Sequence, residues 1–284
     1  MSNLKWQIGD VTVTRVTELA VPTSPKLLFD DLNKEDILKV DWLQPHFANA
    51  RGYMLMSIHA LIVESGTKRI IVDTCLGNDK PRKVEGWSMR SGPFLDDLAQ
   101  AGFARETIDT VLCTHLHVDH VGWNTMLVDG RWMPTFPNAA YLFAREEWHY
   151  WRETQDQEYG NIMDDSVRPI VDAGLATLVE ADHRLTDEVW LEPTPGHTPG
   201  HVSVRISSRG EHAVITGDMT HHPYQMAHPD CAANVDYDQA QSTATRLKFY
   251  AEHADQPILV IGTHFATPTA GHIVRDGDAY RLDV

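Results

Sequence analysis

Residues 115–120, His-Leu-His-Val-Asp-His, bring three imidazoles and a carboxylate together within six positions. A packed core has no use for such a density of ionisable groups, whereas a metal site does. Neutral imidazole and carboxylate are good ligands for Zn²⁺, and also for Fe or Mn. If His115 and His117 extend the apolar strand before them, both side chains point the same way, and Asp119 and His120 on the following turn can face a second ion. The stretch therefore predicts a metal centre.

Four shorter motifs elsewhere in the chain carry the same residue types. They are Asp73 after Ile-Ile-Val, His197 in Thr-Pro-Gly-His, Asp218 in Thr-Gly-Asp, and His264 in Gly-Thr-His. Together with His-x-His-x-Asp-His, this series resembles the signature of the metallo-β-lactamase-fold hydrolases. The resemblance covers roughly residues 55 to 270.

That resemblance implies a fold. It is α/β: an αββα sandwich of two mixed β-sheets face to face, with helices on both outer faces. The metals would lie at one edge, where the loops at the strand ends meet. We expect a single metallo-β-lactamase-like domain over residues 1–284, with residues 1–50 as an N-terminal extension packed on it. A lid over the substrate, a dimer contact and an ordinary extra layer stay open as roles for that extension.

The resemblance also implies a ligand set and two divalent ions per chain, with zinc as the expected metal. Asp73 is expected to orient ligands without binding metal itself. The first ion would be bound by His115, His117 and His197, the second by Asp119, His120 and His264, and Asp218 would bridge them.

The chemistry of such a pair follows from its charge. Two dications that lie close together repel, and bridging anions make the pair tolerable. A water between them ionises near neutral pH, and the metal-bridging hydroxide can attack a carbonyl or phosphoryl group whose developing charge a metal stabilises. Asp218 and Asp119 are the predicted catalytic carboxylates, the first holding both ions and the second carrying a proton to the leaving group.

Differences between this sequence and several branches of the family reduce the number of candidate substrate classes. The β-lactamases proper generally lack a bridging aspartate, so Asp218 argues against β-lactam hydrolysis. The flavin-linked diiron reductases replace the second histidine, here His117, with glutamate. The nucleases of the fold act on polyanions, which a net charge of −16 disfavours. Glyoxalase II usually has Gly-Gly after the motif, where this chain has Gly122-Trp123.

What remains is the group of quorum-quenching lactonases and the related organophosphate and aryl-ester hydrolases, which the Phe136-Pro-Asn-Ala turn and the Gly-Asp-Met-Thr-His-His run resemble. We expect hydrolysis of a neutral lactone or ester: an acyl-homoserine lactone, an aryl ester or a phosphotriester. A thioesterase similar to glyoxalase II and a mononuclear iron persulfide dioxygenase stay open as alternatives, and so does a non-catalytic binding protein.

Three side chains are predicted to contact substrate. His222 belongs to a histidine pair just after Asp218, Trp87 lies in the polar loop 79–91, and Phe265 follows the last ligand. His201, outside the ligand set, is expected to be structural.

Composition sets the remaining limits. The chain is 42% hydrophobic and 23% charged, which is typical of a globular protein, and its net charge of −16 argues against nucleic acid as a partner. The family resemblance implies a small-molecule substrate. No stretch approaches the ~18 apolar residues of a membrane span. Three widely spaced cysteines without Cys-x-x-Cys, and an N-terminus without a signal pattern, favour the cytoplasm. The oligomeric state stays open, with a homodimer as one possibility.

The elements that must position these residues follow from hydrophobic patterning. Apolar runs predict short buried strands, Asn33 and Asp238 are expected helix N-caps, and Asp129-Gly130 predicts a hairpin. The predicted strands are 11–16, 57–63, 69–72, 108–113, 139–144, 189–191, 202–206, 213–216 and 258–261, and the predicted helices are 93–101, 145–153 and 239–252.

Overall fold

The strand that leads into the histidine motif, β5 (Thr110–Leu112), lies inside a seven-stranded sheet of the computed structural model, which describes residues 3–154 and 160–284. It pairs in parallel with β4 and β8, and Val111 lies opposite Ile71 and Tyr141. These three residues are fully buried, which explains why the strands are continuous apolar runs without alternation. The sheet has the order β1 (Lys5–Ile8), β2 (Val11–Thr23), β3 (Met54–Ser65), β4 (Lys68–Val72), β5, β8 (Ala140–Ala144) and β9 (Ala176–Val179).

A second, six-stranded sheet follows in the C-terminal half of the chain. Its strands β12 and β13 are parallel, whereas the other neighbours are antiparallel, so this sheet is also mixed. Its order is β10 (Val189–Pro193), β11 (Val202–Ser208), β12 (Glu211–Ile215), β13 (Ile258–Ile261), β14 (Ala270–Asp276) and β15 (Ala279–Asp283).

The chain divides into two compact units. Unit 1 comprises the residues up to Glu18 together with Ile58–His183, and unit 2 comprises Leu19–Ser57 together with Arg184–Val284. Two of the three boundaries between the units fall within β2 and β3, and the third, between His183 and Arg184, lies between β9 and β10. A single domain over residues 1–284 therefore stays a prediction.

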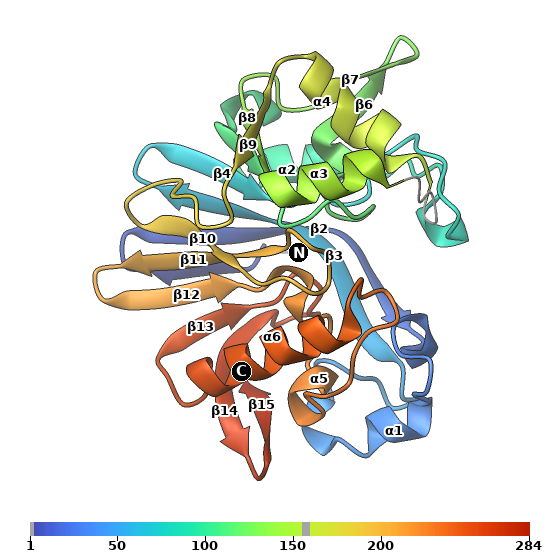
Figure 1. Cartoon of the computed structure of the whole chain (residues 1–284), viewed down its shortest axis with the longest axis vertical. Helices are drawn as coiled ribbons and strands as arrows, with labels where there is room; N and C mark the ends of the chain where they lie inside the picture. Colours follow the sequence, from blue (N-terminus) through green and yellow to red (C-terminus); the bar gives the residue numbers. More distant parts are fainter. Residues whose placement is uncertain (1–2, 155–159) are drawn as a thin grey trace. The chain divides into compact units, whose positions relative to one another are not determined.

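Unit 1 adds three α-helices and a hairpin to its strands (Figure 1). In the hairpin turn, Asp129 and Gly130 both have positive φ, of 49° and 76°, as a type I′ turn requires. Short 3₁₀ turns lie at Glu85–Trp87, Arg105–Thr107 and Gly122–Asn124, and a π-helical turn lies at Met163–Val167. The larger elements are α2 (Phe94–Gln100), α3 (Arg145–Glu153), α4 (Arg168–Asp172), β6 (Thr125–Val128) and β7 (Arg131–Pro134).

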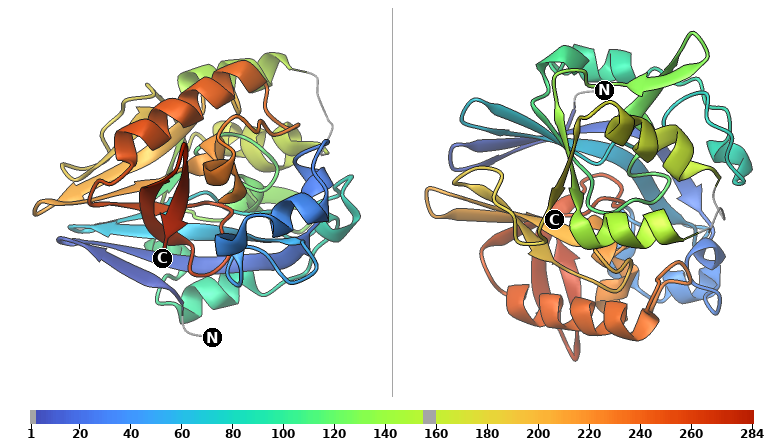
Figure 2. Two further views of the ribbon diagram at one scale, coloured as in Figure 1. Left: turned by 90° about the horizontal axis from the view of Figure 1, so that it is seen from below. Right: turned by 45° about the horizontal axis from the view of Figure 1, so that its top comes forward.

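Unit 2 contains α1 (Lys34–Leu38), α5 (Tyr224–Ala227) and α6 (Gln239–His253), with 3₁₀ turns at Pro25–Leu27, Asp41–Leu43 and Gly217–Met219. Both predicted N-caps are confirmed. Asn33 forms a capping box with Asp36, and the Asp238 side chain accepts a hydrogen bond from Gln241 N. Helix α6 runs along the six-stranded sheet in Figures 1 and 2.

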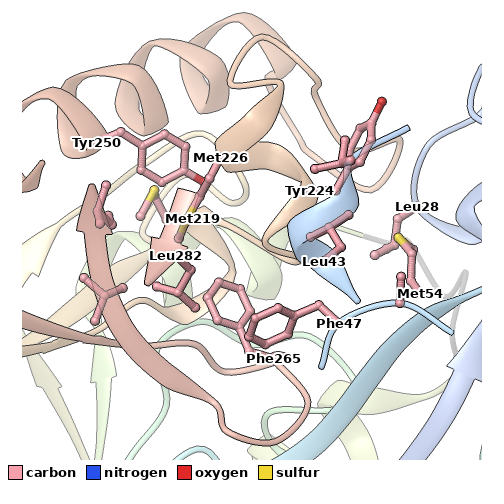
Figure 3. Packing of buried hydrophobic residues seen from close by; sticks show 14 of the residues in the cluster. Leu28, Leu43, Phe47, Met54, Met219, Tyr224, Met226, Tyr250, Phe265 and Leu282 are labelled. Carbon is pink, nitrogen blue, oxygen red and sulfur yellow. The ribbon is translucent and has the colours of Figure 1, made fainter. Parts of the chain in front are cut away.

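The core of unit 2 draws on the N-terminal segment. Phe47 is fully buried and its ring meets that of Phe265 at a centroid distance of 6.1 Å (Figure 3). Leu28 and Leu43 join the same cluster, which also includes Tyr250 of α6. Several residues between 19 and 50 therefore contribute to the core of this unit, and the role of residues 1–50 stays open.

Most of the predicted elements are confirmed with ends that agree within three residues, whereas β2 runs to Thr23 instead of ending at residue 16. The prediction of two mixed sheets with helices is also confirmed. Strands β1, β9, β14 and β15 and helices α4 and α5 were not anticipated by the patterning. In the part of the chain that the structure describes, no helix is long and apolar enough to cross a membrane.

Candidate metal centre

In unit 1, Asp73 holds the two ends of the histidine motif. This residue follows β4 with φ of 58°, a left-handed conformation that turns its carboxylate toward the neighbouring strand end. The carboxylate accepts hydrogen bonds from Thr114 N at 2.8 Å and from Thr114 Oγ1 at 2.9 Å. It also lies 2.9 Å from Nδ1 of His120, whose proton it accepts. Asp73 is thus placed to orient His120 and leave its Nε2 lone pair for a metal.

The motif itself does not continue as a strand. β5 ends at Leu112 and residues 113–120 form a loop, so His115 and His117 do not extend this strand. The loop still brings their rings together, with Nε2 of His115 3.1 Å from Nδ1 of His117. The ring of His120 lies 4.0 Å from that of His115, and Asp119 Oδ1 lies 3.7 Å from His120 Nε2.

Glu147, a residue that the sequence reasoning missed, fixes this loop from helix α3. Its carboxylate accepts hydrogen bonds from Leu116 N at 3.0 Å and from Trp151 Nε1 at 2.6 Å. The Trp151 ring in turn packs against His117 at 5.3 Å. The available signal in the sequence was a glutamate four residues before a tryptophan in a predicted helix, which places both on one helix face.

Glu18 supports the other end of the same loop. It accepts hydrogen bonds from Leu76 N, Gly77 N and Trp123 Nε1 at 2.8, 3.2 and 2.8 Å. Burial raises the pKa of this carboxyl, and these three donors oppose the rise. The contacts tie the segment after Asp73 to the turn after the histidine motif.

The cysteines nearest the motif are not candidate ligands. Burial raises the pKa of the Cys75 and Cys113 thiols well above the usual value, and neither thiol belongs to a cluster of possible metal ligands among the described residues. All three cysteines of the chain are free.

In unit 2, the Asp218 carboxylate is surrounded by histidine nitrogens. Nε2 of His264 lies 3.1 Å from Oδ1, Nε2 of His197 lies 3.6 Å from Oδ2, and Nε2 of His221 lies 3.5 Å from Oδ2. His264 is oriented through Nδ1, which donates to the Ser57 carbonyl at 3.1 Å. The side chains of Asp218 and these three histidines are all buried.

Two other residues hold Asp218 and His197 in place. His201 accepts a hydrogen bond from Asp218 N at 2.8 Å, which confirms its structural role. Asp236 Oδ1 lies 2.9 Å from His197 Nδ1, and no sequence motif announced this contact. The two residues are separated by 39 positions, so a local pattern could not reveal the pair.

The adjacent histidines 221 and 222 have different surroundings. Both ring nitrogens of His222 are used, Nε2 at 2.8 Å from the Phe47 carbonyl and Nδ1 accepting from Tyr224 N at 3.1 Å. Neither ring nitrogen of His221 has a hydrogen-bond partner among the described residues. Burial lowers the pKa of His221 to about 3 and that of His222 to about 4, so both are neutral.

The other predicted substrate contacts lie in different settings. Phe265 is fully buried in the apolar cluster of unit 2, and Trp87 is half-buried on the 3₁₀ turn Glu85–Trp87 of unit 1. Substrate binding by His222, Trp87 and Phe265 stays a prediction.

Within each unit the donor set fits divalent metal. An acceptor at Nδ1 of His120, His197 and His264 favours the tautomer that carries its lone pair on Nε2, as is usual for metal-binding imidazoles. Tetrahedral ligands about 2.0–2.1 Å from an ion lie roughly 3.3–3.4 Å from one another. The separations of 3.1–3.7 Å between neighbouring donors in both units bracket that value. The chain therefore has the ligand chemistry for divalent metal.

Comparison with known proteins gives the family. A model of the Metallo-beta-lactamase superfamily matches residues 54–264. An N-acyl homoserine lactonase from a Bacillus species is 27% identical over 166 residues, which are 58% of this chain and 59% of the relative. The N-acyl homoserine lactonase AiiA of Bacillus thuringiensis subsp. kurstaki is 26% identical with the same coverage. The chain thus spans about 59% of the length of these curated relatives.

Two solved structures are similar to this chain over nearly its whole length. The hydrolase AbOPH of the beta lactamase superfamily has a TM-score of 0.80 and 25% identity, covering 99% of this chain and 97% of its own. AidC, a dizinc quorum-quenching lactonase solved with its product, has a TM-score of 0.79 and 21% identity, covering 99% and 96%. The predicted family and fold are confirmed. With its ligand-rich loops and this match over residues 54–264, the chain belongs to the metallo-β-lactamase superfamily.

Proposed function

We propose that this protein is a metal-dependent hydrolase of neutral lactones or esters. The observation that carries the proposal is the buried Asp218 carboxylate, with the Nε2 atoms of His197 and His264 at 3.6 and 3.1 Å. An aspartate in this position is what distinguishes the lactonase-like branch from the β-lactamases proper. N-acyl homoserine lactonases among the relatives support the same substrate class.

We propose that the chain binds two divalent ions, with zinc as the expected metal. When bound, such a pair would lower the pKa of a water to near neutral and would polarise the substrate carbonyl. The first ion would be held by His115, His117 and His197, the second by Asp119, His120 and His264, and both by Asp218.

The chain's own residues supply the remaining steps. Asp119 has a partly exposed carboxylate, 13% accessible, beside His120, and is proposed to carry a proton to the leaving group. His221 is proposed to contact the substrate, since neither of its ring nitrogens has a hydrogen-bond partner among the described residues and Nε2 lies 3.5 Å from Asp218 Oδ2.

The electrostatics of the chain favour a neutral substrate. A net charge of −16 repels polyanions, whereas a lactone, an aryl ester or a phosphotriester needs no basic recognition patch. A glyoxalase II-like thioesterase is the second candidate, because thioesters present the same electrophilic carbonyl. Three free cysteines support a reducing, cytoplasmic location, and the homodimer stays a prediction.

A hydrolysis panel tests the proposal. The metal-replete protein is assayed with an acyl-homoserine lactone, an aryl ester, a phosphotriester and a glutathione thioester. We expect the lactone to give the highest kcat/KM. Preference for the thioester would favour the second candidate, and no turnover of any substrate with metal bound would refute the hydrolase.

Metal content is the first prediction. We expect two divalent ions per chain after equilibration with Zn²⁺, because seven proposed ligands exceed what one tetrahedral ion can use. Elemental analysis of the purified, zinc-saturated protein measures the ratio. One ion or fewer per chain would contradict the proposed pair, and one iron per chain would favour the persulfide dioxygenase alternative.

The neighbouring histidines give a second prediction. His221→Ala should lower kcat/KM for the preferred substrate at least ~10-fold while the melting temperature changes little. His222→Ala should instead destabilise the fold by roughly 1–3 kcal/mol, because it leaves the buried Phe47 carbonyl unsatisfied. Steady-state kinetics and thermal unfolding of both variants separate the roles. If His222→Ala lowers kcat/KM and His221→Ala destabilises the fold, then His222 is the substrate contact.

A further inference from the structure

The segment before helix α6 wraps around the turn that carries His197. Three consecutive residues contact that turn. The Asp236 side chain lies 2.9 Å from His197 Nδ1. Tyr237 N donates to the His197 carbonyl at 3.0 Å, and Asp238 N donates to the Gly196 carbonyl at 2.9 Å. The same short segment therefore fixes both the backbone and the ring of His197.

The turn that carries His197 packs closely against helix α6. Gly196 has φ of +130°, and a Cβ on it would lie 2.3 Å from Ser242 N, so only glycine allows the turn to approach the helix this closely. Thr245 Oγ1 donates to the Pro195 carbonyl at 2.7 Å. The turn is thus held against the first two turns of α6.

Asp236 is the charged member of this contact. Its side chain is fully buried, and its second oxygen accepts a hydrogen bond from Ala233 N at 3.0 Å. The Oδ1 contact places the proton of His197 on Nδ1, so that the Nε2 lone pair faces Asp218 at 3.6 Å. Both carboxylate oxygens of Asp236 are engaged by donors, which favours an orienting role over a ligand role.

We propose that Asp236 is a positioning residue that sets the tautomer and the orientation of His197 for metal binding. It is the counterpart in unit 2 of Asp73, which holds Nδ1 of His120 in unit 1 at the same distance of 2.9 Å. The inference rests on the proposed function, in which His197 is a metal ligand. Buried carboxylates that orient metal-binding histidines typically change metal affinity by ~10–100-fold when removed.

Metal affinity, measured separately from turnover, tests the inference. The full-length chain is titrated with Zn²⁺ in competition with a chromogenic chelator, and its Co²⁺ derivative is examined by visible absorption. Asp236→Ala should weaken the affected site ~10–100-fold and change the Co²⁺ spectrum. Asp236→Asn, which keeps the shape and loses the charge, should give a smaller loss. Asp230→Asn, an exposed aspartate of the same loop, is the matched control and should bind as the wild type does.

A double-mutant cycle separates positioning from general stability. In a His197→Ala background, Asp236→Asn should cost no further affinity, since the residue acts through His197. Two results would overturn the inference and leave the proposed function untouched. The first is equal metal affinity of the wild type, Asp236→Asn and Asp236→Ala. The second is a loss of metal affinity by Asp236→Asn that persists in the His197→Ala background. A wild-type chain that binds neither Zn²⁺ nor Co²⁺ would overturn the proposed function, and the inference with it.

Discussion

Asp218→Ala is expected to lose about one metal ion per chain and at least ~10²-fold in kcat, a size typical of dismantled electrostatic stabilisation. The carboxylate lies 3.1 Å from His264 Nε2 and 3.6 Å from His197 Nε2. Without it, no protein anion would be common to the two proposed ions, and their mutual repulsion would expel one. The pKa of the attacking water would then rise toward that of a singly bound water. The loss should appear mainly in kcat, because the pocket for substrate stays intact.

Elemental analysis and steady-state kinetics of Asp218→Ala measure both effects. His201 is unsuitable as a control, because its Nε2 accepts the hydrogen bond from Asp218 N. His212 is exposed on β12, and His212→Ala should keep both metals and normal turnover. An Asp218→Ala protein with two ions and near-normal kcat would rule out the bridge and the mechanism built on it.

Asp165→Ala is expected to destabilise the protein by roughly 3–5 kcal/mol, the cost of leaving a buried charge without its partner. Arg82 binds the Asp165 carboxylate through two hydrogen bonds of 2.6 and 2.9 Å, and its side chain is fully buried. Lys80, also fully buried, lies 3.8 Å from the same carboxylate. Burial lowers the pKa of Lys80 to about 7, so this amine can shed its proton, whereas the Arg82 guanidinium cannot.

Urea-induced unfolding of the full chain measures this effect. Asp164 is the matched control, because it is the adjacent aspartate and its ion pair with Arg168 is about half exposed. Asp164→Ala should change the free energy of unfolding by at most about 0.5 kcal/mol. Equal stabilities of the two variants would mean that the buried cluster contributes nothing net to the fold.

The sequence alone determined the features that depend on near neighbours. Some features need only a few adjacent residues and can therefore be predicted from the sequence. They are the histidine motif, the Asp129-Gly130 turn and the N-caps Asn33 and Asp238. Apolar runs located β4, β5 and β8, because strands buried on both faces carry an unbroken pattern. Strands β14 and β15 mix polar and apolar residues, so the hydrophobic pattern did not predict them.

Only the tertiary structure decided which distant residues support the site. Asp236 meets His197 across 39 positions, Ser57 meets His264 across 207, and Arg82 meets Asp165 across 83. A hydrogen bond of this kind needs a match of position and direction that exists only after the chain has folded back on itself. The same reason distinguishes His221 from His222. In sequence they are equivalent neighbours, but the backbone turns one imidazole toward Asp218 and the other toward the Phe47 carbonyl.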